Sequence, residues 1–301
     1  MRIAITGRNG QVAQSLLEAA AASGIDICTI ARPEVDLLHP AQAKTALLSL
    51  RPEAVVGAAA YTAVDLAETE AALAYSINVE GAQAVAYAAA ELGIPVVHLS
   101  TDYVFDGNLQ RPYLEDDAPS PQSVYGASKL DGERAVAAAN ANHAILRTAW
   151  VYSPFGRNFA QTMLTMACNR DEISVVGDQL GSPTSALDIA EGIMAVVRNL
   201  IDRPSAPELR GVFHMTGGGE TNWAEFAEAI FAASAAVGGP CARVRKIQTS
   251  EFSTPARRPA NSRLDNARLA NIHGVRLPHW RQSLKSCIER IVARDFRGEV
   301  T

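Results

Sequence analysis

Hydrophobic positions in the first half of the chain fall into short apolar runs separated by longer alanine-rich stretches. The runs are rich in β-branched residues and predict five strands, at residues 2–6, 27–30, 54–57, 95–99 and 144–147. The stretches between them predict helices at residues 11–22, 41–50 and 73–92. A polar loop follows at 102–121, and another helix runs from its end to about residue 140. Strands that alternate with helices of this length indicate an α/β fold, a doubly wound parallel sheet with helices on both faces.

The second half of the chain is less regular and predicts a smaller lobe. Its pattern predicts helices at residues 158–169, 185–200 and 278–293 and strands at 172–176 and 211–215. A further helix should reach Ala236 from an N-cap at Thr221 or Asn222, with Glu225 at capping-box spacing from Asn222. We therefore expect one domain at 1–150 and a smaller C-terminal lobe at 151–301, and we leave open the return of later segments to the first sheet.

Composition and charge narrow the class of protein. The 301 residues carry 27 Lys and Arg against 32 Asp and Glu, whereas a nucleic-acid binder usually presents a basic face. The longest uncharged run, residues 229–242, is shorter than the roughly 20 apolar residues of a membrane span. The four cysteines lie far apart, and no basic stretch precedes an apolar one at the start. We therefore expect a cytoplasmic protein without disulfides, a membrane anchor or a nucleic-acid partner.

A glycine-containing turn joins the first strand to the first helix. It reads TGRNGQVA over residues 6–13. Its glycines allow a ligand to approach the backbone closely, and the free amides of the helix N-terminus favour a pyrophosphate. The turn predicts a dinucleotide site made by Gly7, Asn9, Gly10, Gln11 and Val12. The spacing is GxxGxxA, so an ordinary strand-to-helix turn remains the alternative.

The end of the second strand usually distinguishes NAD from NADP. An acidic residue there bonds the ribose 2′-hydroxyl, whereas an arginine accommodates the 2′-phosphate. This chain has Ala31 in that region, followed by Arg32. The missing carboxylate and the adjacent guanidinium predict that NADPH is preferred over NADH. The alternative is that Arg32 is a solvated surface residue.

A tyrosine and a lysine follow the fourth strand with a spacing of four. Tyr125 and Lys129 lie near the start of the predicted helix, on one face and one turn apart. An ammonium lowers the pKa of a nearby phenol, and such a tyrosine can exchange a proton with a carbonyl or alcohol while a nicotinamide exchanges hydride. Thr101, just past the fourth strand, can hydrogen-bond the same oxygen. The pattern predicts Thr101, Tyr125 and Lys129 as catalytic residues; a surface Tyr/Lys pair is the alternative.

Taken together, these features resemble the extended short-chain dehydrogenase/reductase family. Longer sequence words narrow the resemblance to its dTDP-4-dehydrorhamnose reductase branch, in order from residue 1 to about 290. The words are AAAYTAVD at 58–65, STDYVFDG at 100–107, VYGASK at 124–129, RTAWVY at 147–152, DQLGSPT at 178–184 and TPARRPANSRLD at 254–265. The last two are much more specific than YxxxK.

The resemblance implies a reductase that uses NAD(P)H to reduce the C4 ketone of dTDP-4-dehydro-β-L-rhamnose. It implies an NAD(P)-binding Rossmann domain at 1–150 and substrate binding by the lobe after it. By analogy Tyr125 donates the proton, Lys129 lowers its pKa and holds the nicotinamide ribose, and Thr101 orients the ketone. Further cofactor contacts are implied at Asp36, Leu37, Ala60, Tyr61, Thr62 and Leu99.

The resemblance also implies a set of substrate contacts. Besides Thr101, it includes Asp102 and Trp150, which match residues that contact the sugar or nucleotide. Arg257 and Arg258 suit a substrate that carries a diphosphate, because guanidinium binds phosphate in bidentate fashion. The alternatives are a plain core role for Trp150 and a structural ion pair for one of the two arginines.

The chain departs from this branch where some relatives form a dimer bridged by magnesium through three glutamates. This chain has Ser15 and Leu187 at the first two positions, and only Glu289 matches. One carboxylate is too few for a dedicated site for a hard cation. We therefore expect no metal, and either a monomer or a dimer that magnesium does not bridge.

Two other functions stay open. A regulatory subunit of the methionine adenosyltransferase type shares the fold and binds dinucleotide without established turnover, and nucleotide-sugar epimerases use the same tyrosine and lysine. Retention of the three catalytic residues together with Trp150 favours an enzyme, and the TPARRP word favours the reductase. The six histidines form no clear cluster in the sequence, so none receives a role. They are His39, His98, His143, His214, His273 and His279.

Overall fold

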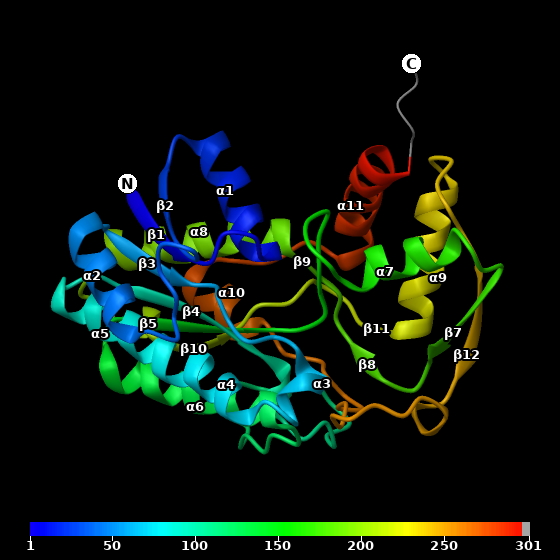
Figure 1. Ribbon diagram of the computed structural model, residues 1–301, viewed down its shortest axis with the longest axis horizontal. Helices are drawn as coiled ribbons and strands as arrows, with labels where there is room; N and C mark the ends of the chain where they lie inside the picture. The colour runs from blue at the N-terminus through cyan, green and yellow to red at the C-terminus, as the bar shows by residue number, and fades with distance from the viewer. Residues whose placement is uncertain (297–301) are drawn as a thin grey trace.

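The computed structural model describes residues 1–296 and shows a sheet domain joined to a smaller lobe (Figure 1). The last five residues of the lobe that the sequence predicts over 151–301 lie outside the described part. The domain is built on one parallel sheet with strand order β10-β5-β4-β3-β1-β2. Its strands are β1 (Arg2–Thr6), β2 (Asp26–Ile30), β3 (Ala54–Gly57), β4 (Val96–Thr101), β5 (His143–Thr148) and β10 (Gly211–His214). The predicted α/β class with a doubly wound parallel sheet is confirmed.

Helices cover both faces of the sheet because successive strand residues point to opposite sides. Ile3 and Ile5 pack on one side, in a core shared with α1 (Gln11–Ser23) and α8 (Ala186–Asp202). Ala4, between them, packs on the other side, in a core shared with other helices (Figure 1). Those helices are α2 (Pro40–Leu50), α5 (Ala82–Glu91) and α6 (Val124–Ala139). The strand order reverses between β1 and β3, and ligands of such sheets bind beyond the carboxyl ends of the strands at that point.

The long helix predicted at 73–92 is interrupted. The structure has α4 (Ala71–Tyr75), then a π-helical segment, η1 (Ser76–Gly81), and then α5. The segment places Asn78 between two elements: its Oδ1 accepts from the backbone N–H of Tyr61 (2.8 Å), and its Nδ2 donates to Ser128 Oγ (2.9 Å). π-Helical turns often mark functional positions. Here the turn ties the segment after β3 to the start of α6.

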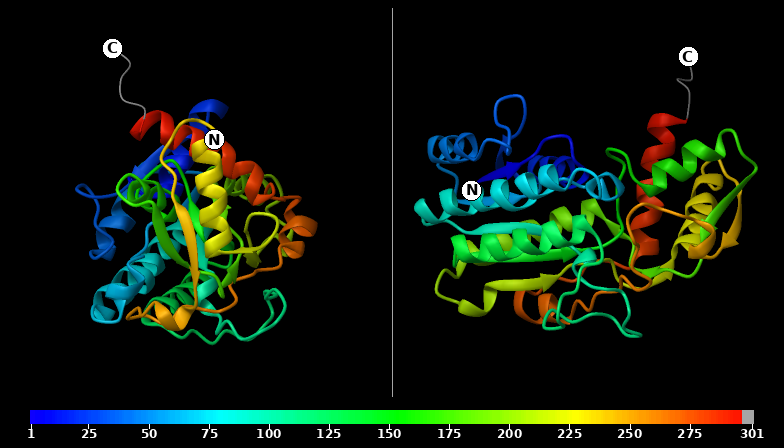
Figure 2. Two further views of the ribbon diagram at one scale, coloured as in Figure 1. Left: turned by 90° about the vertical axis from the view of Figure 1, so that its right-hand side faces the viewer. Right: turned by 60° about the horizontal axis from the view of Figure 1, so that its bottom comes forward.

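The smaller lobe has its own core. It contains α7 (Phe159–Ala167), α9 (Trp223–Ala235) and α11 (Trp280–Asp295), with a parallel pair formed by β7 (Glu172–Val176) and β12 (Arg243–Ile247) (Figure 2). The predicted N-cap is present, since Asn222 Oδ1 accepts from the Glu225 N–H at 2.9 Å. The carboxylate of Glu225 instead accepts from Thr221 Oγ1, so the capping box is not reciprocal.

The chain crosses between the two parts more than once. After the first lobe segments, α8 packs on α1 and β10 joins the sheet beside β5, before α9 returns to the lobe. The sequence did not predict β12, whose RVRKI pattern is strongly charged, or the short helices α3 (Val64–Ala67) and α10 (Ala267–His273). The smallest ladders pair β6 (Val151–Tyr152) with β9 (Thr184–Ser185) and β8 (Leu180–Gly181) with β11 (Thr221–Asn222). None of the helices within residues 1–296 has the length and apolarity needed to cross a membrane.

Candidate active site

A cavity of about 1280 Å³ runs from the glycine turn to residues of the smaller lobe. It lies at the carboxyl ends of β1, β3, β4 and β5, where the strand order predicts a ligand. Every cofactor-contacting residue predicted from the sequence lines it. So do the predicted substrate contacts Thr101, Asp102, Trp150 and Arg258, whereas Arg257 does not.

The glycine turn has the shape of a phosphate cradle. Gly7 has φ +88°, a conformation that favours glycine, and an added Cβ would lie 3.4 Å from Ala59 Cβ. Thr6 Oγ1 accepts from the N–H groups of Ala58 and Ala59 (both 3.0 Å), which ties the turn to the end of β3. No side chain caps the N-terminus of α1 at Gly10. Its first amides are therefore free of a side-chain acceptor and fit a dinucleotide pyrophosphate.

Two arginines line the cavity near the glycine turn and the end of β2. Arg32 is exposed and lines the cavity, as does Arg8 in the glycine turn. Arg8 donates to Glu34 Oε2 (3.2 Å) and to Thr29 Oγ1 (3.4 Å), so its side chain lies beside the end of β2. The sequence reasoning missed Arg8. Its position in the turn after β1 could have indicated it, because parallel pairing of β1 with β2 places that turn beside the end of β2.

The part of the cavity around Tyr125 is built on the start of α6. Ser123 Oγ accepts from the Gly126 N–H (3.1 Å) and caps the helix, which places Tyr125 in its first turn. An added Cβ on Gly126 would lie 2.2 Å from the carbonyl oxygen of Tyr103, so only glycine permits this approach. The ring of Tyr103 meets that of Tyr125 edge to face, with centroids 5.6 Å apart.

The environment of Tyr125 differs from the expectation that Lys129 lowers its pKa. Burial raises the pKa of Tyr125 above its ordinary value near 10 and outweighs the hydrogen bond with Thr101, which acts in the other direction; the charge of Asp102 adds to the rise. No hydrogen bond joins Tyr125 to Lys129 in the part of the chain that the structure describes. The phenol is therefore protonated at neutral pH, which is the form that a proton donor needs.

Lys129 is buried, with 2% of its surface exposed. Its Nζ donates to the carbonyl oxygen of Leu99 (2.6 Å) and lies 3.4 Å from Nε2 of His98. Burial lowers the pKa of Lys129 to about 8, and the nearby charge of Glu133 acts against that change. The group still carries most of its charge at pH 7.

Asp102 is a buried carboxylate in the wall of the cavity. Its Oδ1 accepts from Thr101 Oγ1 (3.0 Å), and its Oδ2 has no hydrogen-bond partner among residues 1–296. Burial raises its pKa to about 6. A buried acceptor without a partner is costly, and a sugar hydroxyl would satisfy it.

Two stacked tryptophans form the lobe side of the cavity. The rings of Trp150 and Trp223 lie nearly parallel, with centroids 3.6 Å apart and an angle of 12°. Trp150 has φ +49°, and an added Cβ on Gly181 would lie 2.3 Å from its ring. Close packing thus holds Trp150 in an unusual conformation. The sequence analysis did not predict Trp223 as a cavity residue, because nothing in the sequence around it indicates a contact with Trp150.

The two arginines of the TPARRP word have different surroundings. Arg258 donates to Asp65 Oδ2 (2.7 Å) and to the hydroxyl of Tyr103 (3.1 Å) and lines the cavity. Arg257 is exposed, and its one hydrogen bond within residues 1–296 is to Gln122 Oε1, at 3.4 Å. Asp65 also accepts from the backbone of Ala256, so α3 holds this word in place.

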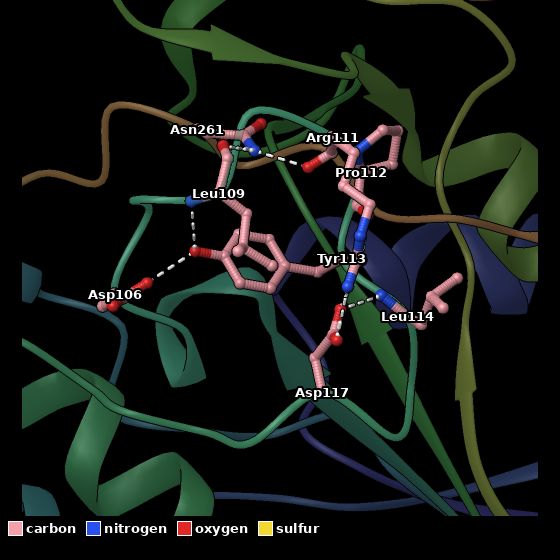
Figure 3. Close-up of polar contacts among 8 residues, drawn as sticks. All are labelled: Asp106, Leu109, Arg111, Pro112, Tyr113, Leu114, Asp117 and Asn261. Atoms are coloured by element: carbon pink, nitrogen blue, oxygen red, sulfur yellow. Dashed lines mark hydrogen bonds and ion pairs between the residues drawn. The ribbon is translucent and has the colours of Figure 1, made fainter.

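The loop predicted at 102–121 is fixed by polar contacts rather than by regular structure, as Figure 3 shows. Tyr113 donates to Asp106 (2.6 Å), and Arg111 forms two hydrogen bonds with Asp117 (2.7 and 2.8 Å). Nδ2 of Asn261 donates to two backbone carbonyl oxygens of this loop (2.7 and 2.8 Å). The loop therefore anchors the segment around Asn261, in which Pro259 and Ser262 line the cavity.

The three positions compared with the metal-bridged dimer of some relatives have different surroundings. Ser15 is buried and donates to the carbonyl oxygen of Gln11 (2.9 Å), while Leu187 is half-buried and Glu289 is exposed. The helices α1 and α11 are instead joined by two hydrogen bonds, each of 2.7 Å, between Glu18 and Arg290. No group of three or more His, Cys, Asp or Glu side chains within residues 1–296 could hold a metal ion.

Comparison with known proteins agrees with this arrangement. Residues 1–293 match the model of the RmlD substrate binding domain family. A dTDP-4-dehydrorhamnose reductase of Sinorhizobium fredii is 49% identical, over 96% of this chain and 97% of that protein. One from Burkholderia thailandensis is 42% identical, over 98% and 100%. The crystal structure of the Bacillus anthracis enzyme in complex with NADP superimposes with a TM-score of 0.88 at 35% identity, over 95% of this chain and 98% of that one. The chain belongs to the dTDP-4-dehydrorhamnose reductase family.

Proposed function

We propose that the protein is an NADPH-dependent reductase that converts dTDP-4-dehydro-β-L-rhamnose to dTDP-β-L-rhamnose. One observation carries this proposal. One cavity is lined by the dinucleotide cradle, by Thr101 and Tyr125, and by an aromatic wall together with Arg258. A cofactor and a nucleotide sugar can therefore share it, with their reactive ends near the tyrosine.

The residues of the cavity fit a nicotinamide dinucleotide, as the positive φ of Gly7 and the free amides of α1 indicate. The residues that would hold it are Gly7, Asn9, Gly10, Gln11 and Val12 at the pyrophosphate and, further along the wall, Arg32, Asp36, Leu37, Ala60, Tyr61, Thr62, Leu99 and Lys129. When bound as NADPH, it supplies the hydride. We assign this part to the sheet domain, which includes residues 1–150 with α8 and β10, and substrate binding to the remaining lobe.

The chain's own residues supply the proton and the orientation. Tyr125, which burial keeps protonated, donates its hydroxyl proton to the oxygen of the C4 ketone. Thr101 lies beside it on β4 and orients that oxygen by a hydrogen bond, for which its single hydroxyl proton leaves Asp102 Oδ1. Lys129 lines the same cavity and presents its positive charge to the cofactor.

The lobe side supplies recognition. Trp150 offers an aromatic face to the nucleotide or sugar, and Asp102 offers an unpaired carboxylate oxygen to a hydroxyl group. Arg258 presents the cavity with a guanidinium that suits a diphosphate. Arg257 lies outside the cavity wall, and we assign it no contact with the substrate.

We further propose that NADPH is preferred over NADH and that magnesium does not bridge a dimer. Arg8 and Arg32 both line the cavity, and Arg8 lies beside the end of β2, where position 31 carries Ala in place of an acid. Arg8 also pairs with Glu34, so Arg32 is the guanidinium that we assign to the 2′-phosphate. At the positions of the metal-bridged interface, Ser15 has only a neutral hydroxyl and Leu187 has no ligand atom.

One experiment separates this function from its alternatives. Purified protein is mixed with NADPH and the 4-keto sugar nucleotide, cofactor oxidation is followed by absorbance, and the product is identified by NMR. A reductase oxidises one NADPH for each ketone reduced. An epimerase gives a changed sugar without net cofactor consumption, and a regulatory binding module gives binding without turnover. Either outcome would overturn the proposal.

The same assay compares the two cofactors. A charge-assisted hydrogen bond is worth about 1.5–3 kcal/mol, or roughly tenfold or more in affinity. We expect kcat/KM to favour NADPH by about this factor and the ratio to fall in the Arg32→Ala variant. Equal values for the two cofactors would contradict the preference.

A further inference from the structure

His98 lies on β4, beside the catalytic lysine, and is 2% exposed. A glycine on the neighbouring strand leaves space for its ring, and the other side of the ring faces a helix. Gly57 faces it across the β3–β4 pair, and an added Cβ there would lie 2.8 Å from His98 Nδ1. An added Cβ on Gly132 of α6 would lie 4.0 Å from His98 Nε2. The sheet and the helix thus enclose an imidazole whose Nε2 is turned toward α6.

Among residues 1–296, no carboxylate forms an ion pair with the ammonium of Lys129. Glu133, whose charge acts on it, accepts two hydrogen bonds from Arg147 (2.9 and 2.7 Å) and one from Ser100 Oγ (2.5 Å). Its charge is therefore shared with a buried guanidinium. Two neutral acceptors remain close to Nζ: the carbonyl oxygen of Leu99 at 2.6 Å and His98 Nε2 at 3.4 Å.

His98 can accept a hydrogen bond only if it is neutral. Burial, helped by the charge of Lys129, holds the pKa of His98 well below its usual range. The other titratable groups around the pair are Glu133 and Arg147, which neutralise each other, and Tyr125 and Asp102 on the side of the cavity. A neutral imidazole beside an ammonium presents the lone pair of Nε2 and carries its proton on Nδ1.

We propose that His98 is a positioning residue for the reaction: its Nε2 accepts a hydrogen bond from Lys129 Nζ and, with Leu99, fixes the ammonium at the wall of the cavity. An ammonium has three N–H donors. Two are held by the protein, and the third is left for the ligand. The role of Lys129 in this inference rests on the proposed function, whereas the contact between His98 and Lys129 is independent of it.

The test replaces the acceptor and follows the lysine directly. In His98→Leu the side chain has no acceptor, while in His98→Gln an amide oxygen can reach the position of Nε2. The protein is labelled with ¹³C at lysine Cε, and the titration of Lys129 is followed by NMR without ligand. The sequence has only four lysines, and the other three are exposed, so the resonance of Lys129 is readily separated.

Loss of the acceptor destabilises the charged form, so we expect the pKa of Lys129 to fall from about 8 by one unit or more in His98→Leu and to stay near 8 in His98→Gln. The pH at which NADPH affinity declines should fall with it. An unchanged lysine titration in His98→Leu would overturn the proposal, as would equal falls in both variants. If His98→Leu does not fold, His98→Asn replaces it, because its amide reaches only the position of Nδ1.

The two proposals can fail separately. If the unsubstituted protein does not oxidise NADPH in the presence of the 4-keto sugar nucleotide, the proposed function is wrong, yet the lysine titration still tests the contact with His98. If turnover is present and the Lys129 titration does not respond to His98, the function stands and the positioning role is wrong. A merely structural histidine would lower the melting temperature in both variants without moving that titration.

Discussion

At the sheet end of the cavity, Thr101, Tyr125 and Lys129 come from one strand and the helix that follows it, within residues 101–129. At the lobe end, Trp150, Trp223 and Arg258 come from three segments spread between residues 150 and 258. The first group is held by strand pairing, a capped helix and buried hydrogen bonds. The second is held by ring stacking and by an ion pair with α3. The residues that we assign to the chemical step thus lie close together in the sequence, while those that we assign to recognition come from distant parts of the chain.

This difference predicts how substitutions at each end act. At the sheet end, a change at Tyr125 or Thr101 should lower kcat and leave binding nearly intact, because these groups act on the reacting atoms, whereas Lys129 also holds the cofactor. At the lobe end, a change should raise the KM for the sugar nucleotide, because the contact forms equally in the ground state and the transition state. The following predictions test that division, starting with the largest effect.

Tyr125→Phe removes the proton donor while keeping the ring that packs against Tyr103. We expect kcat to fall by about 10²–10⁴-fold, the usual contribution of a general acid, with the affinity for NADPH unchanged. Steady-state kinetics and a fluorescence titration with NADPH measure the two quantities. Turnover close to that of the unsubstituted protein would remove Tyr125 from its role.

Arg258→Met and Arg257→Met form a matched pair at the lobe end. Only Arg258 lines the cavity, so its loss should raise the KM for the sugar nucleotide by about 10–100-fold, as expected for a charge-assisted bond to phosphate. Arg257→Met should leave KM within about twofold. The reverse order in the same kinetic assay would contradict the assignment of the diphosphate to Arg258.

Trp223→Ala removes the ring stacked on Trp150. An aromatic pair contributes about 0.5–1.5 kcal/mol beyond its buried area, and Trp150 would lose the packing that supports its positive φ. We expect the KM to rise about tenfold with kcat nearly unchanged. Trp223→Phe keeps an aromatic face and is the control. A loss of folding on calorimetry would instead make Trp223 part of the lobe core.

The smallest expected effect is on the stability of the fold, and Asp102→Asn tests it by removing a buried carboxylate. Because the folded pKa of Asp102 is about 6, above its ordinary value of 3.8, the folded protein holds this proton more tightly than the unfolded chain. The ionised carboxylate therefore destabilises the fold above pH 6, and the penalty is absent below about pH 4. We expect Asp102→Asn to raise the Tm by about 3 °C at pH 8 and to leave it unchanged at pH 4. Equal Tm values at pH 8 would contradict this.

Much of the sheet domain follows from local pattern. The predicted run at 54–57 matches β3, and the other strands end within two residues of their predicted limits. The glycine turn and the Tyr/Lys pair are also local, because a strand followed by glycines and a helix, or a spacing of four in a helix, fixes geometry over a few residues. The break at η1 was missed, since the contacts of Asn78 with Tyr61 and Ser128 lie far apart in the sequence.

The sequence by itself determined the class of fold, and it predicted a place for the cofactor and a set of catalytic residues, because each depends on neighbours along the chain. Only the tertiary structure decided that Trp223 stacks on Trp150, that Arg258 rather than Arg257 faces the cavity, and that His98 lies beside Lys129. Each of these depends on the approach of distant segments, and a single sequence carries no record of such distances. Burial is also decided only by the tertiary structure. It keeps the Tyr125 phenol protonated and lowers the pKa of Lys129.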